Sequence, residues 1–458
     1  MKLQSFHSVY LIGIGGIGMS ALARYFLLMK KKVKGYDKTS TELTRSLEQE
    51  GIEINYDDSE SSIPTELKSL LADEVLVIYT PAIPRTNQQL NWFQSKNFRL
   101  QKRSQVLGMI TANSKTVAVA GTHGKTTTSS ILAHILHSSG HGCNAFLGGI
   151  TANYGSNFLF SSAEAITVVE ADEFDRSFLT LKPDLAVITS MDADHLDIYG
   201  AHDELIESFQ LFANLVATTG KLFLQENLSP LSSSSEQARY GLNNEVFAHA
   251  TATKNTNQWI SNFTVGEVKI EGVHFKMPGN HNLQNALVAS AVCLHLGVDK
   301  VKIKNALESF NGIKRRFEFH IEHPDLVYID DYAHHPTELN ATISAVKLRY
   351  SSKKITGIFQ PHLFSRTRDF MDEFAESLAA LDQIYLLDIY PAREEPIDGV
   401  DSQSLLDKIP NPSKKLVDKV GLLKMLEADS LDVLLTLGAG DIDQLVLPIS
   451  EKLKKALV

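Results

Sequence analysis

Short apolar runs alternate with segments of helical periodicity along most of this chain. The runs are rich in β-branched residues and end in glycine or polar loops, which is typical of buried strands in parallel sheets. The helical segments would then cover both faces of each sheet, as in α/β proteins. The predicted strands are Ser8–Ile14, Lys32–Tyr36, Val75–Tyr79, Thr116–Ala120, Ala165–Val169, Leu185–Thr189, Leu326–Asp330, Ile355–Phe359, Ile384–Leu387 and Val433–Leu437.

Two polar interruptions divide this pattern into three parts. Residues 111–114 lie just before the predicted strand Thr116–Ala120, and Asn311-Gly312 lies where a helical segment gives way to basic residues. The serine-rich segment 229–237 is interpreted as a loop, and no repeat of fixed period is present. Because 458 residues correspond to about three domains of usual size, we predict α/β domains at residues 1–112, 113–312 and 313–458.

A glycine loop follows the predicted strand Thr116–Ala120. It has the sequence Gly121-Thr122-His123-Gly124-Lys125-Thr126-Thr127 and leads into a helical segment at Ser129–His137. A strand, a glycine loop and a helix in this order present backbone N–H groups and a lysine to nucleotide phosphates. Lys125 would reach the β- and γ-phosphates, and Thr126 would hold a magnesium ion. The loop is shorter than usual, and the alternative is a surface turn, but its context predicts ATP binding.

A second glycine loop, Gly13-Ile14-Gly15-Gly16-Ile17-Gly18, follows the first predicted strand and precedes a helical segment at Met19–Leu28. This is the context of a dinucleotide site, with Asp37 about twenty residues further on, where it would meet a ribose hydroxyl. The loop specifies only a diphosphate at a helix N-terminus, which a UDP-sugar also carries. NAD(P) and another nucleotide therefore both remain open at this point.

Acidic residues follow two further predicted strands. Glu170 ends one of them, and His195 lies just beyond the strand Leu185–Thr189. Ligands collect beyond the carboxyl ends of strands in open α/β sheets, and magnesium accepts carboxylates and an occasional imidazole. We expect Glu170 and His195 to be magnesium ligands. For the aspartates in the same loops, solvent exposure or helix capping is the favoured interpretation.

Composition narrows the class of protein further. A net charge of −10 disfavours nucleic acid as a partner, although loops can still supply a positive field for an anionic small molecule. Cys143 and Cys293 are too few for a disulfide framework and indicate buried thiols of a reducing compartment. No run approaches the ~20 apolar residues of a membrane span, and the N-terminus lacks a signal-peptide pattern. We therefore predict a cytoplasmic enzyme.

Further motifs lie in order along the chain. They are Glu170-Ala171-Asp172-Glu173, Asp194-His195-Leu196-Asp197, Pro278-Gly279-Asn280-His281-Asn282 with Asn285, Asp330-Asp331-Tyr332-Ala333-His334-His335-Pro336-Thr337-Glu338, Gln360-Pro361-His362, Ser365-Arg366-Thr367-Arg368-Asp369 and Gly438-Ala439-Gly440-Asp441. With the two glycine loops, they resemble the Mur ligases, the ATP-dependent amide-forming enzymes of peptidoglycan precursor synthesis. The resemblance covers essentially the whole chain. It is strongest to the alanine-adding branch. The short phosphate loop Gly-Thr-His-Gly-Lys-Thr is the form that this family has.

The resemblance implies a function for each domain. The first, Rossmann-like domain would bind UDP-N-acetylmuramate, the central phosphate-loop domain would be the ATPase, and the C-terminal Rossmann-like domain would bring L-alanine. The implied cofactors are ATP and Mg²⁺, in a monomer or weak homodimer with no nucleic-acid or membrane partner. The reaction would pass the γ-phosphoryl group of ATP to the lactyl carboxylate, and the amine of L-alanine would then attack the acyl phosphate.

The resemblance also assigns site residues. The ATP-site positions are Gly121, Thr122, His123, Gly124, Lys125, Thr126, Thr127, His281, Asn282, Asn285 and Arg316. The UDP-substrate positions are Gly15, Gly16, Ile17, Gly18, Met19, Ser20 and Asp37. The magnesium ligands would be Thr126, Glu170 and His195, the amino-acid contacts His334 and Arg366, and the catalytic residues Lys125, His195, Glu170 and Arg366.

Simpler interpretations stay open for five of these residues. Helix capping and interior hydrogen bonds are the alternative for His281, Asn282 and Asn285, and a solvated charge run is the alternative for Arg316. For Arg366, the alternative is an ion pair with Asp369 or Asp372 on its own helical segment.

The chain departs from the family pattern at two places. Leu363 stands where many members have an arginine, so an amino-acid contact at that position is unsupported or passes to Arg366 or Arg368. Residues 208–211 contain no lysine for the carbamate that several other Mur ligases carry, which favours the alanine-adding branch. The alternatives are a recycling ligase that adds a tripeptide to UDP-N-acetylmuramate, an NAD(P)-dependent oxidoreductase, and a non-catalytic ATP-switched binding protein.

Overall fold

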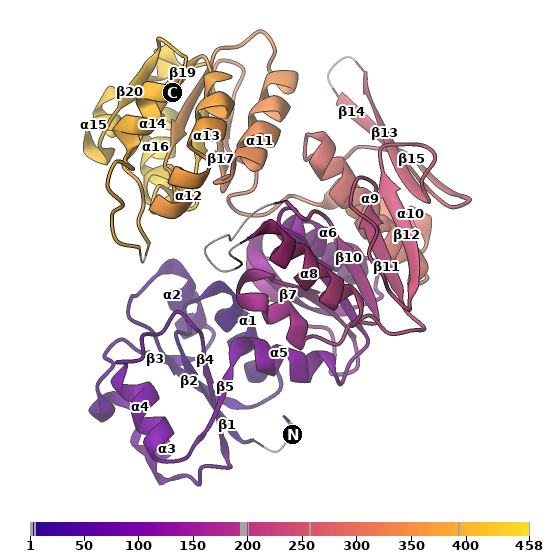
Figure 1. Cartoon of the computed structure of the whole chain (residues 1–458), viewed down its shortest axis with the longest axis vertical. Coiled ribbons are helices and arrows are strands. Elements are labelled where there is room, and N and C mark those ends of the chain that lie inside the picture. The colour runs from indigo at the N-terminus through magenta and orange to yellow at the C-terminus, as the bar shows by residue number, and fades with distance from the viewer. Residues whose placement is uncertain are drawn as a thin grey trace. The chain divides into compact units, whose positions relative to one another are not determined.

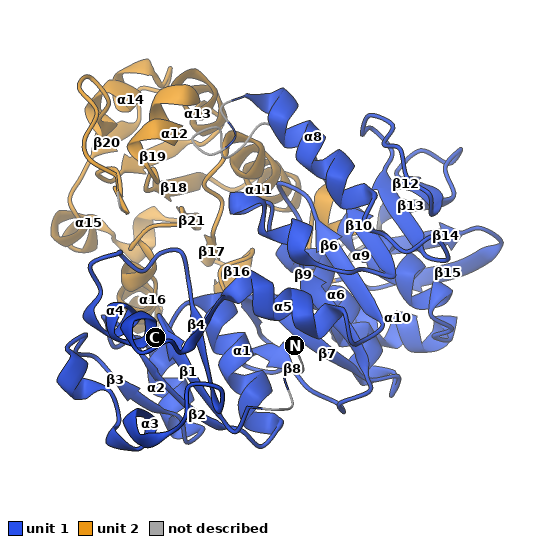
Figure 2. Ribbon diagram, turned by 60° about the horizontal axis from the view of Figure 1, so that its bottom comes forward, with its two compact units in different colours: residues 1–275, 284–311 blue, residues 276–283, 312–458 orange. Residues whose placement is uncertain are grey.

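A computed structural model describes residue 3 and residues 6–192, 199, 201–255, 258–392 and 394–457 of the chain. The chain forms two compact units, coloured separately in Figure 2. Unit 1 consists of residues 1–275 and 284–311, and unit 2 of residues 276–283 and 312–458. Unit 1 contains two sheets and unit 2 contains one, so each unit is described by itself.

The first sheet of unit 1 has five parallel strands in the order β3-β2-β1-β4-β5 (Figure 1). Alternate residues of β1 face opposite sides of it: Val9 and Leu11 pack in the core that contains α1 and α5, and Tyr10 and Ile12 pack with α3 and α4. The elements are β1 (Ser8–Ile12), α1 (Ile17–Leu28), β2 (Lys32–Tyr36), α2 (Glu42–Gln49), β3 (Glu53–Asn55), η2 (Glu60–Ser62), α3 (Thr65–Ser69), β4 (Val75–Tyr79), α4 (Gln88–Ser95), β5 (Arg99–Lys102) and α5 (Arg103–Thr111).

The second sheet of unit 1 has ten strands in the order β15-β14-β13-β12-β11-β10-β6-β9-β7-β8. Its centre is parallel, whereas β8, β14 and β15 run antiparallel to their preceding strands. The strands are β6 (Thr116–Ala120), β7 (Cys143–Thr151), β8 (Ser156–Leu159), β9 (Ile166–Glu170), β10 (Leu185–Ile188), β11 (Lys221–Gln225), β12 (Glu236–Gly241), β13 (Ala248–Asn255), β14 (Gln258–Val265) and β15 (Val268–Val273). The helices are α6 (Lys125–Ser138), η3 (Phe174–Thr180), α8 (His202–Ala213), α9 (Asn280–His295) and α10 (Lys300–Ser309).

The two sheets of unit 1 share one hydrophobic core. Met19, Leu22 and Phe26 of α1 belong to the same buried cluster as Phe146 of β7 and Phe158 of β8. A polar contact fixes the same interface, because the buried Asn157 side chain accepts from Arg24 and donates to the Ile17 carbonyl. Helix α1 therefore packs the glycine loop at residues 13–18 against β7 and β8, which belong to the same sheet as the strand before the phosphate loop.

Unit 2 contains one six-stranded sheet in the order β16-β17-β21-β18-β19-β20, parallel except for β16. Its strands are apolar on both faces, and helices α11, α13 and α14 cover one face while α15 and α16 cover the other. The elements are β16 (Glu318–Glu322), β17 (Val327–Asp331), α11 (Pro336–Arg349), β18 (Ile355–Phe359), α12 (Phe364–Asp369), α13 (Met371–Ala379), β19 (Gln383–Leu386), α14 (Ser402–Lys408), β20 (Lys414–Leu416), α15 (Lys419–Met425), η4 (Ala428–Ser430), β21 (Val433–Leu437) and α16 (Asp443–Ala456).

These elements confirm the predicted α/β class with mostly parallel sheets. Predicted strands recur within two residues at each end. The segment 229–237 is not all loop, because β12 begins at Glu236. The strands that were not predicted are β3, β5, β7, β8, β11, β12, β13, β14, β15, β16 and β20. The domain boundaries at residues 112 and 312 stay predictions. Among the described residues, no helix is both long and apolar enough to span a bilayer.

Candidate functional site

The phosphate loop, residues 121–127, connects the buried strand β6 to the N-terminus of α6. Gly121 and Gly124 have φ values of 135° and 82°, which side-chain-bearing residues rarely adopt. A Cβ on Gly121 would lie 2.0 Å from Thr189 Oγ1, and one on Gly124 would lie 2.9 Å from Asn285 Oδ1. Glycine is therefore required at both positions by conformation and by space. The free N–H groups of the first α6 turn and its dipole favour an anion here.

Two residues after β10 brace this loop from outside. Ser190 Oγ accepts the His123 N–H at 2.7 Å and lies 2.9 Å from Thr122 Oγ1. Thr189 Oγ1 donates to the His123 carbonyl. The loop backbone is thus held by hydroxyl groups of the neighbouring strand end, in addition to its own glycines.

Lys125 lies across the phosphate loop and forms a buried ion pair. Its Nζ donates to the two Glu173 carboxylate oxygens at 2.8 and 2.7 Å and to the Gly121 carbonyl at 2.7 Å. The Glu173 side chain is fully buried, and that of Lys125 is 13% exposed. Burial alone would lower the pKa of Lys125, but the carboxylates of Glu173, Asp172 and Glu170 raise it above its ordinary value. Lys125 therefore carries a positive charge where phosphate oxygens would bind.

Thr126 and Glu170 meet at the carboxyl ends of β6 and β9. Thr126 Oγ1 donates to Glu170 Oε1 at 3.0 Å, and the Gly148 N–H of β7 donates to Glu170 Oε2 at 2.9 Å. The predicted partner His195 lies outside the described residues. The structure therefore brings two of the three expected magnesium ligands together, beside the phosphate loop.

A cleft of about 280 Å³ extends from the glycine loop at residues 13–18 to Glu170. Its lining includes Gly16, Ile17, Gly18 and Met19 from the loop and α1, together with Arg103, Gly148 and Asp172. Asp37 Oδ2 accepts the Gly15 N–H at 2.8 Å, and Ser20 Oγ donates to the Ile17 carbonyl at 2.8 Å. Both side chains stabilise the loop that lines the cleft.

The boundary between the two units falls within helix α9, so residues 278–283 of the motif belong to unit 2 and Asn285 belongs to unit 1. In unit 1, the buried Asn285 accepts from Thr128 Oγ1 at 3.1 Å and lies against Gly124. In unit 2, Asn282 Nδ2 donates to the Pro278 carbonyl at 2.8 Å. Burial lowers the pKa of His281 to about 4, with Glu338 raising it and Arg316 lowering it further. His281 is therefore neutral near pH 7.

The arginine loop, residues 313–317, precedes β16 in unit 2. Arg315 and Phe317 have left-handed φ values of 61° and 52° on either side of Arg316. The Tyr332 N–H donates to the Arg315 carbonyl at 2.7 Å, and the Phe317 N–H donates to Asp331 Oδ2 at 2.8 Å. Burial raises the pKa of Asp331 to about 6, against the lowering effect of Arg316. The Tyr332 N–H on one side and the buried Asp331 carboxylate on the other thus hold the backbone around Arg316.

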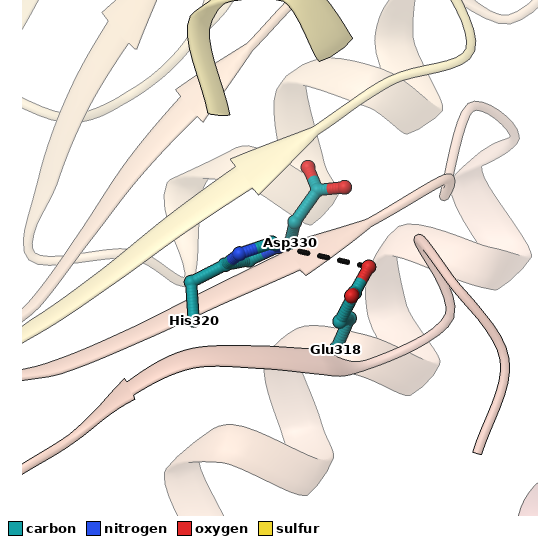
Figure 3. Close-up of side chains that lie close together, drawn as sticks. All are labelled: Glu318, His320 and Asp330. Carbon is teal, nitrogen blue, oxygen red and sulfur yellow. Dashed lines mark ion pairs between the residues drawn. The ribbon is translucent and has the colours of Figure 1, made fainter. Parts of the chain in front are cut away.

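Arg315 is fixed by a polar cluster that Figure 3 shows in close-up. The ligand-type atoms of Glu318, His320 and Asp330 lie within 4.8 Å of one another. The Arg315 Nε donates to Asp330 Oδ2 at 3.0 Å, and its backbone N–H donates to Glu318 Oε2 at 2.8 Å. A second guanidinium nitrogen donates to the Gly438 carbonyl at 2.6 Å. The guanidinium therefore supplies the positive charge that this carboxylate cluster requires.

His334 and Arg366, the expected amino-acid contacts, lie near one side chain that received no assignment. His362 packs 6.0 Å from the His334 ring, and its Nδ1 lies 3.4 Å from Arg366 Nη1. Asp369 Oδ1 accepts from Arg368 Nε at 2.8 Å. His334 also contacts Glu338 Oε2 at 3.1 Å.

Four further residues of these sites were missed in the sequence. Arg103 begins α5 directly after β5, so its place at the carboxyl edge of a parallel sheet was a usable signal. Glu173 was quoted within a motif, but only the fold shows it paired with Lys125. His362 was also quoted within a motif, four residues before Arg366, but received no role. Gly148 acts through Glu170, 22 positions away, for which the sequence carries no local signal.

The fold and the described site define a three-sheet α/β protein with a phosphate loop and an adjacent carboxylate, Glu170. That carboxylate shares a cleft with the glycine loop at residues 13–18. Family models match nearly all of the chain: the Mur ligase family catalytic domain at residues 8–115, the Mur ligase middle domain at 119–293, and the Mur ligase glutamate ligase domain at 315–440. A UDP-N-acetylmuramate–L-alanine ligase of Flavobacterium johnsoniae is 49% identical over 99% of this chain and 100% of its own length.

Solved structures agree with this likeness. A UDP-N-acetylmuramate–alanine ligase of Thermotoga maritima has a TM-score of 0.80 and 25% identity, covering 98% of this chain and 99% of that one. A murein peptide ligase of Psychrobacter arcticus shares the fold, with a TM-score of 0.69, 23% identity and 98% of each chain covered. The chain belongs to the Mur ligase family.

Proposed function

We propose that this chain joins L-alanine to the lactyl carboxylate of UDP-N-acetylmuramate, using ATP and giving UDP-N-acetylmuramoyl-L-alanine, ADP and phosphate. The observation that carries the proposal is the sequence identity of 49% and 50%, over 99% of the chain, to two relatives named UDP-N-acetylmuramate–L-alanine ligase. The cleft of unit 1 supports it, because one cavity joins a diphosphate type of glycine loop to the carboxylate beside the phosphate loop. The same reaction places the protein in peptidoglycan precursor synthesis, and we propose the cytoplasm as its compartment.

The reaction proceeds in two steps. A lactyl carboxylate oxygen attacks the γ-phosphorus of ATP, and the bond to the β-phosphate oxygen breaks, giving an acyl phosphate and ADP. The uncharged amine of L-alanine then attacks the acyl carbon, and phosphate leaves with the former carboxylate oxygen. The first step requires positioning and charge neutralisation more than covalent catalysis. Lys125 and the N–H groups of the first turn of α6 provide both.

A divalent cation fits the donor set beside this loop. A hydroxyl oxygen of Thr126 and a carboxylate oxygen of Glu170 lie 3.0 Å apart, and Mg²⁺ prefers such oxygen ligands together with substrate phosphates. We assign Thr126, Glu170 and His195 to hold it. When bound, the ion would neutralise charge on the transferring phosphoryl group.

The other assignments follow the same scheme. We propose the domains 1–112 for UDP-N-acetylmuramate, 113–312 for ATP and 313–458 for L-alanine, acting as a monomer or weak homodimer. Arg103 joins the glycine loop at residues 15–20 and Asp37 in the UDP-substrate site. His281, Asn282, Asn285 and Arg316 contribute to nucleotide binding, and His334 and Arg366 to binding of the alanine carboxylate.

Acceptor-dependent phosphate release tests this function. The purified chain with ATP and Mg²⁺ should release phosphate only when UDP-N-acetylmuramate and L-alanine are both present. A strong preference for a tripeptide over L-alanine would establish a recycling ligase instead. Release that no acceptor stimulates, together with binding of NADH, would contradict every ligase assignment.

A further inference from the structure

Gly148 of β7 is a glycine that its own backbone does not require. Its φ lies outside the positive range that favours glycine, unlike that of Gly121 or Gly124. An alanine at residue 148 would therefore adopt the native backbone without conformational strain. Any need for glycine at this position comes from its surroundings.

The Glu170 carboxylate occupies the space into which a side chain at residue 148 would point. A Cβ added to Gly148 would lie 2.3 Å from Oε2, 2.5 Å from Oε1 and 2.6 Å from Cδ of Glu170. At the same time the Gly148 N–H donates to Oε2 at 2.9 Å. The residue thus supplies a hydrogen bond to the carboxylate and leaves the space that the carboxylate occupies.

The opposite oxygen of Glu170 is held by another element. Thr126 Oγ1, in the first turn of α6, donates to Oε1 at 3.0 Å. Glu170 itself ends β9, which lies between β6 and β7 in the sheet. The carboxylate is therefore oriented between donors from two neighbouring elements, one of them the backbone of residue 148.

We propose that Gly148 is a positioning residue for the divalent cation: it sets the direction of the Glu170 carboxylate by its N–H and by the absence of a side chain. This inference rests on the proposed role of Glu170 as a magnesium ligand. An alanine Cβ at residue 148 would displace the Glu170 carboxylate and so move an oxygen ligand of the cation. Displacement of a positioned group by about one ångström has large functional consequences.

Direct Mn²⁺ binding tests the proposal without turnover. Free Mn²⁺ is titrated by electron paramagnetic resonance in the presence of ADP for the unaltered chain, Gly148→Ala, Glu170→Ala and Glu170→Asp. We expect Gly148→Ala to weaken Mn²⁺ binding at least about tenfold, as outer-shell partners of metal ligands typically do.

A second-site variant distinguishes positioning from general damage. Glu170→Asp shortens the side chain and vacates the space that an alanine Cβ at residue 148 would take. The loss of Mn²⁺ affinity caused by Gly148→Ala should therefore be much smaller in the Glu170→Asp background than in the unaltered chain. Gly421→Ala is the matched control, because its Cβ would meet only ordinary contacts at 3.4 Å or more; it should leave Mn²⁺ binding unchanged.

The outcomes separate two failures. If Glu170→Ala weakens Mn²⁺ binding and Gly148→Ala does not, the inference about Gly148 is overturned and the role of Glu170 stands. Equal losses from Gly148→Ala in both backgrounds would also overturn it, because Gly148 would then act independently of Glu170. If Glu170→Ala itself leaves Mn²⁺ binding unchanged, the metal assignment of Glu170 fails, and the inference fails with it.

Discussion

The phosphate loop at residues 121–127 and the arginine loop at residues 313–317 both hold backbone in the positive-φ region, but with different residues. Gly121 and Gly124 adopt it without a side chain, whereas Arg315 and Phe317 adopt it with large ones. A non-glycine residue in the left-handed region costs about 1–2 kcal/mol. In the arginine loop, Asp330, Asp331 and Glu318 offset this cost by accepting hydrogen bonds from the strained residues.

The two loops therefore differ in what stabilises their positive-φ backbone. A glycine loop depends on space, so an added methyl group harms it. A loop of non-glycine residues depends on its buried acceptors, so removal of a partner harms it, while an added glycine relieves it. The predictions below test this difference, beginning with the largest expected effect.

Lys125→Ala should reduce turnover by about 10³-fold or more, because it removes a fixed positive charge from the phosphoryl site. UDP-N-acetylmuramate binding should stay nearly unchanged. Steady-state phosphate release and calorimetry measure the two quantities. Parallel loss of sugar-nucleotide binding would contradict the assignment of the two loops to different ligands.

The same variant needs a stability control, since it leaves the fully buried Glu173 carboxylate without Lys125. Breaking a buried pair in this way typically costs about 3–5 kcal/mol. The double variant Lys125→Ala with Glu173→Gln should recover part of the lost unfolding free energy but none of the activity. Recovery of activity would show that the single variant had failed through folding.

Gly121→Ala should lower kcat/KM for ATP by about 10²-fold, because its Cβ would displace Thr189 and the loop backbone by more than an ångström. Gly140→Ala is the matched control: Gly140 has a φ of 78° and open space around its Cβ position. The control should lose about 1 kcal/mol of unfolding free energy and keep its ATP kinetics. Similar kinetics for both variants would show that space in the phosphate loop is unimportant.

Asp331→Asn should change how the stability of the arginine loop depends on pH. The pKa of Asp331 is raised to about 6 in the folded chain, so its contribution is present below its ordinary pKa near 4 and is lost as pH rises through 6. The variant should therefore become more stable relative to the unaltered chain between pH 4 and pH 6, by up to roughly 3 kcal/mol. Denaturant unfolding across this range measures the slope, with the exposed Asp325→Asn as control. A flat difference would contradict the burial argument.

Arg315→Gly should be more stable than Arg315→Ala by about 1 kcal/mol. Both variants lose the guanidinium hydrogen bonds to Asp330 and Gly438, but only alanine retains the strain of the left-handed backbone. At Arg349, the last residue of α11, the order should reverse, since glycine is less favourable than alanine in a helix by about 1 kcal/mol. Thermal unfolding of the four variants gives both differences. The same order at both positions would show that Arg315 is not strained.

The sequence predicted the parts of this molecule that depend on local pattern. Strands such as β2, β4, β18 and β21 have the predicted bounds, and the phosphate loop was predicted because glycine, lysine and threonine carry its chemistry in adjacent positions. The hairpin strands β14 and β15 were missed, because alternating polar residues there gave no buried apolar run.

Residues that act across the fold could not be predicted. Asp37 was singled out as a ribose contact, but its hydrogen bond to the Gly15 N–H of the glycine loop was not predicted. Lys125 and Glu173 are 48 positions apart, and Gly148 and Glu170 are joined only where β7 and β9 pair. Such pairs depend on the register of neighbouring strands, which one sequence does not reveal.

The central claim, that the chain activates a carboxylate as an acyl phosphate, is tested most directly by following oxygen. UDP-N-acetylmuramate labelled with ¹⁸O at both lactyl carboxylate oxygens is incubated with the chain, ATP, Mg²⁺ and L-alanine, and the released phosphate is analysed by mass spectrometry. The account predicts one ¹⁸O atom in each phosphate and one in the amide carbonyl of the product. Phosphate free of ¹⁸O, formed together with the amide product, would contradict it.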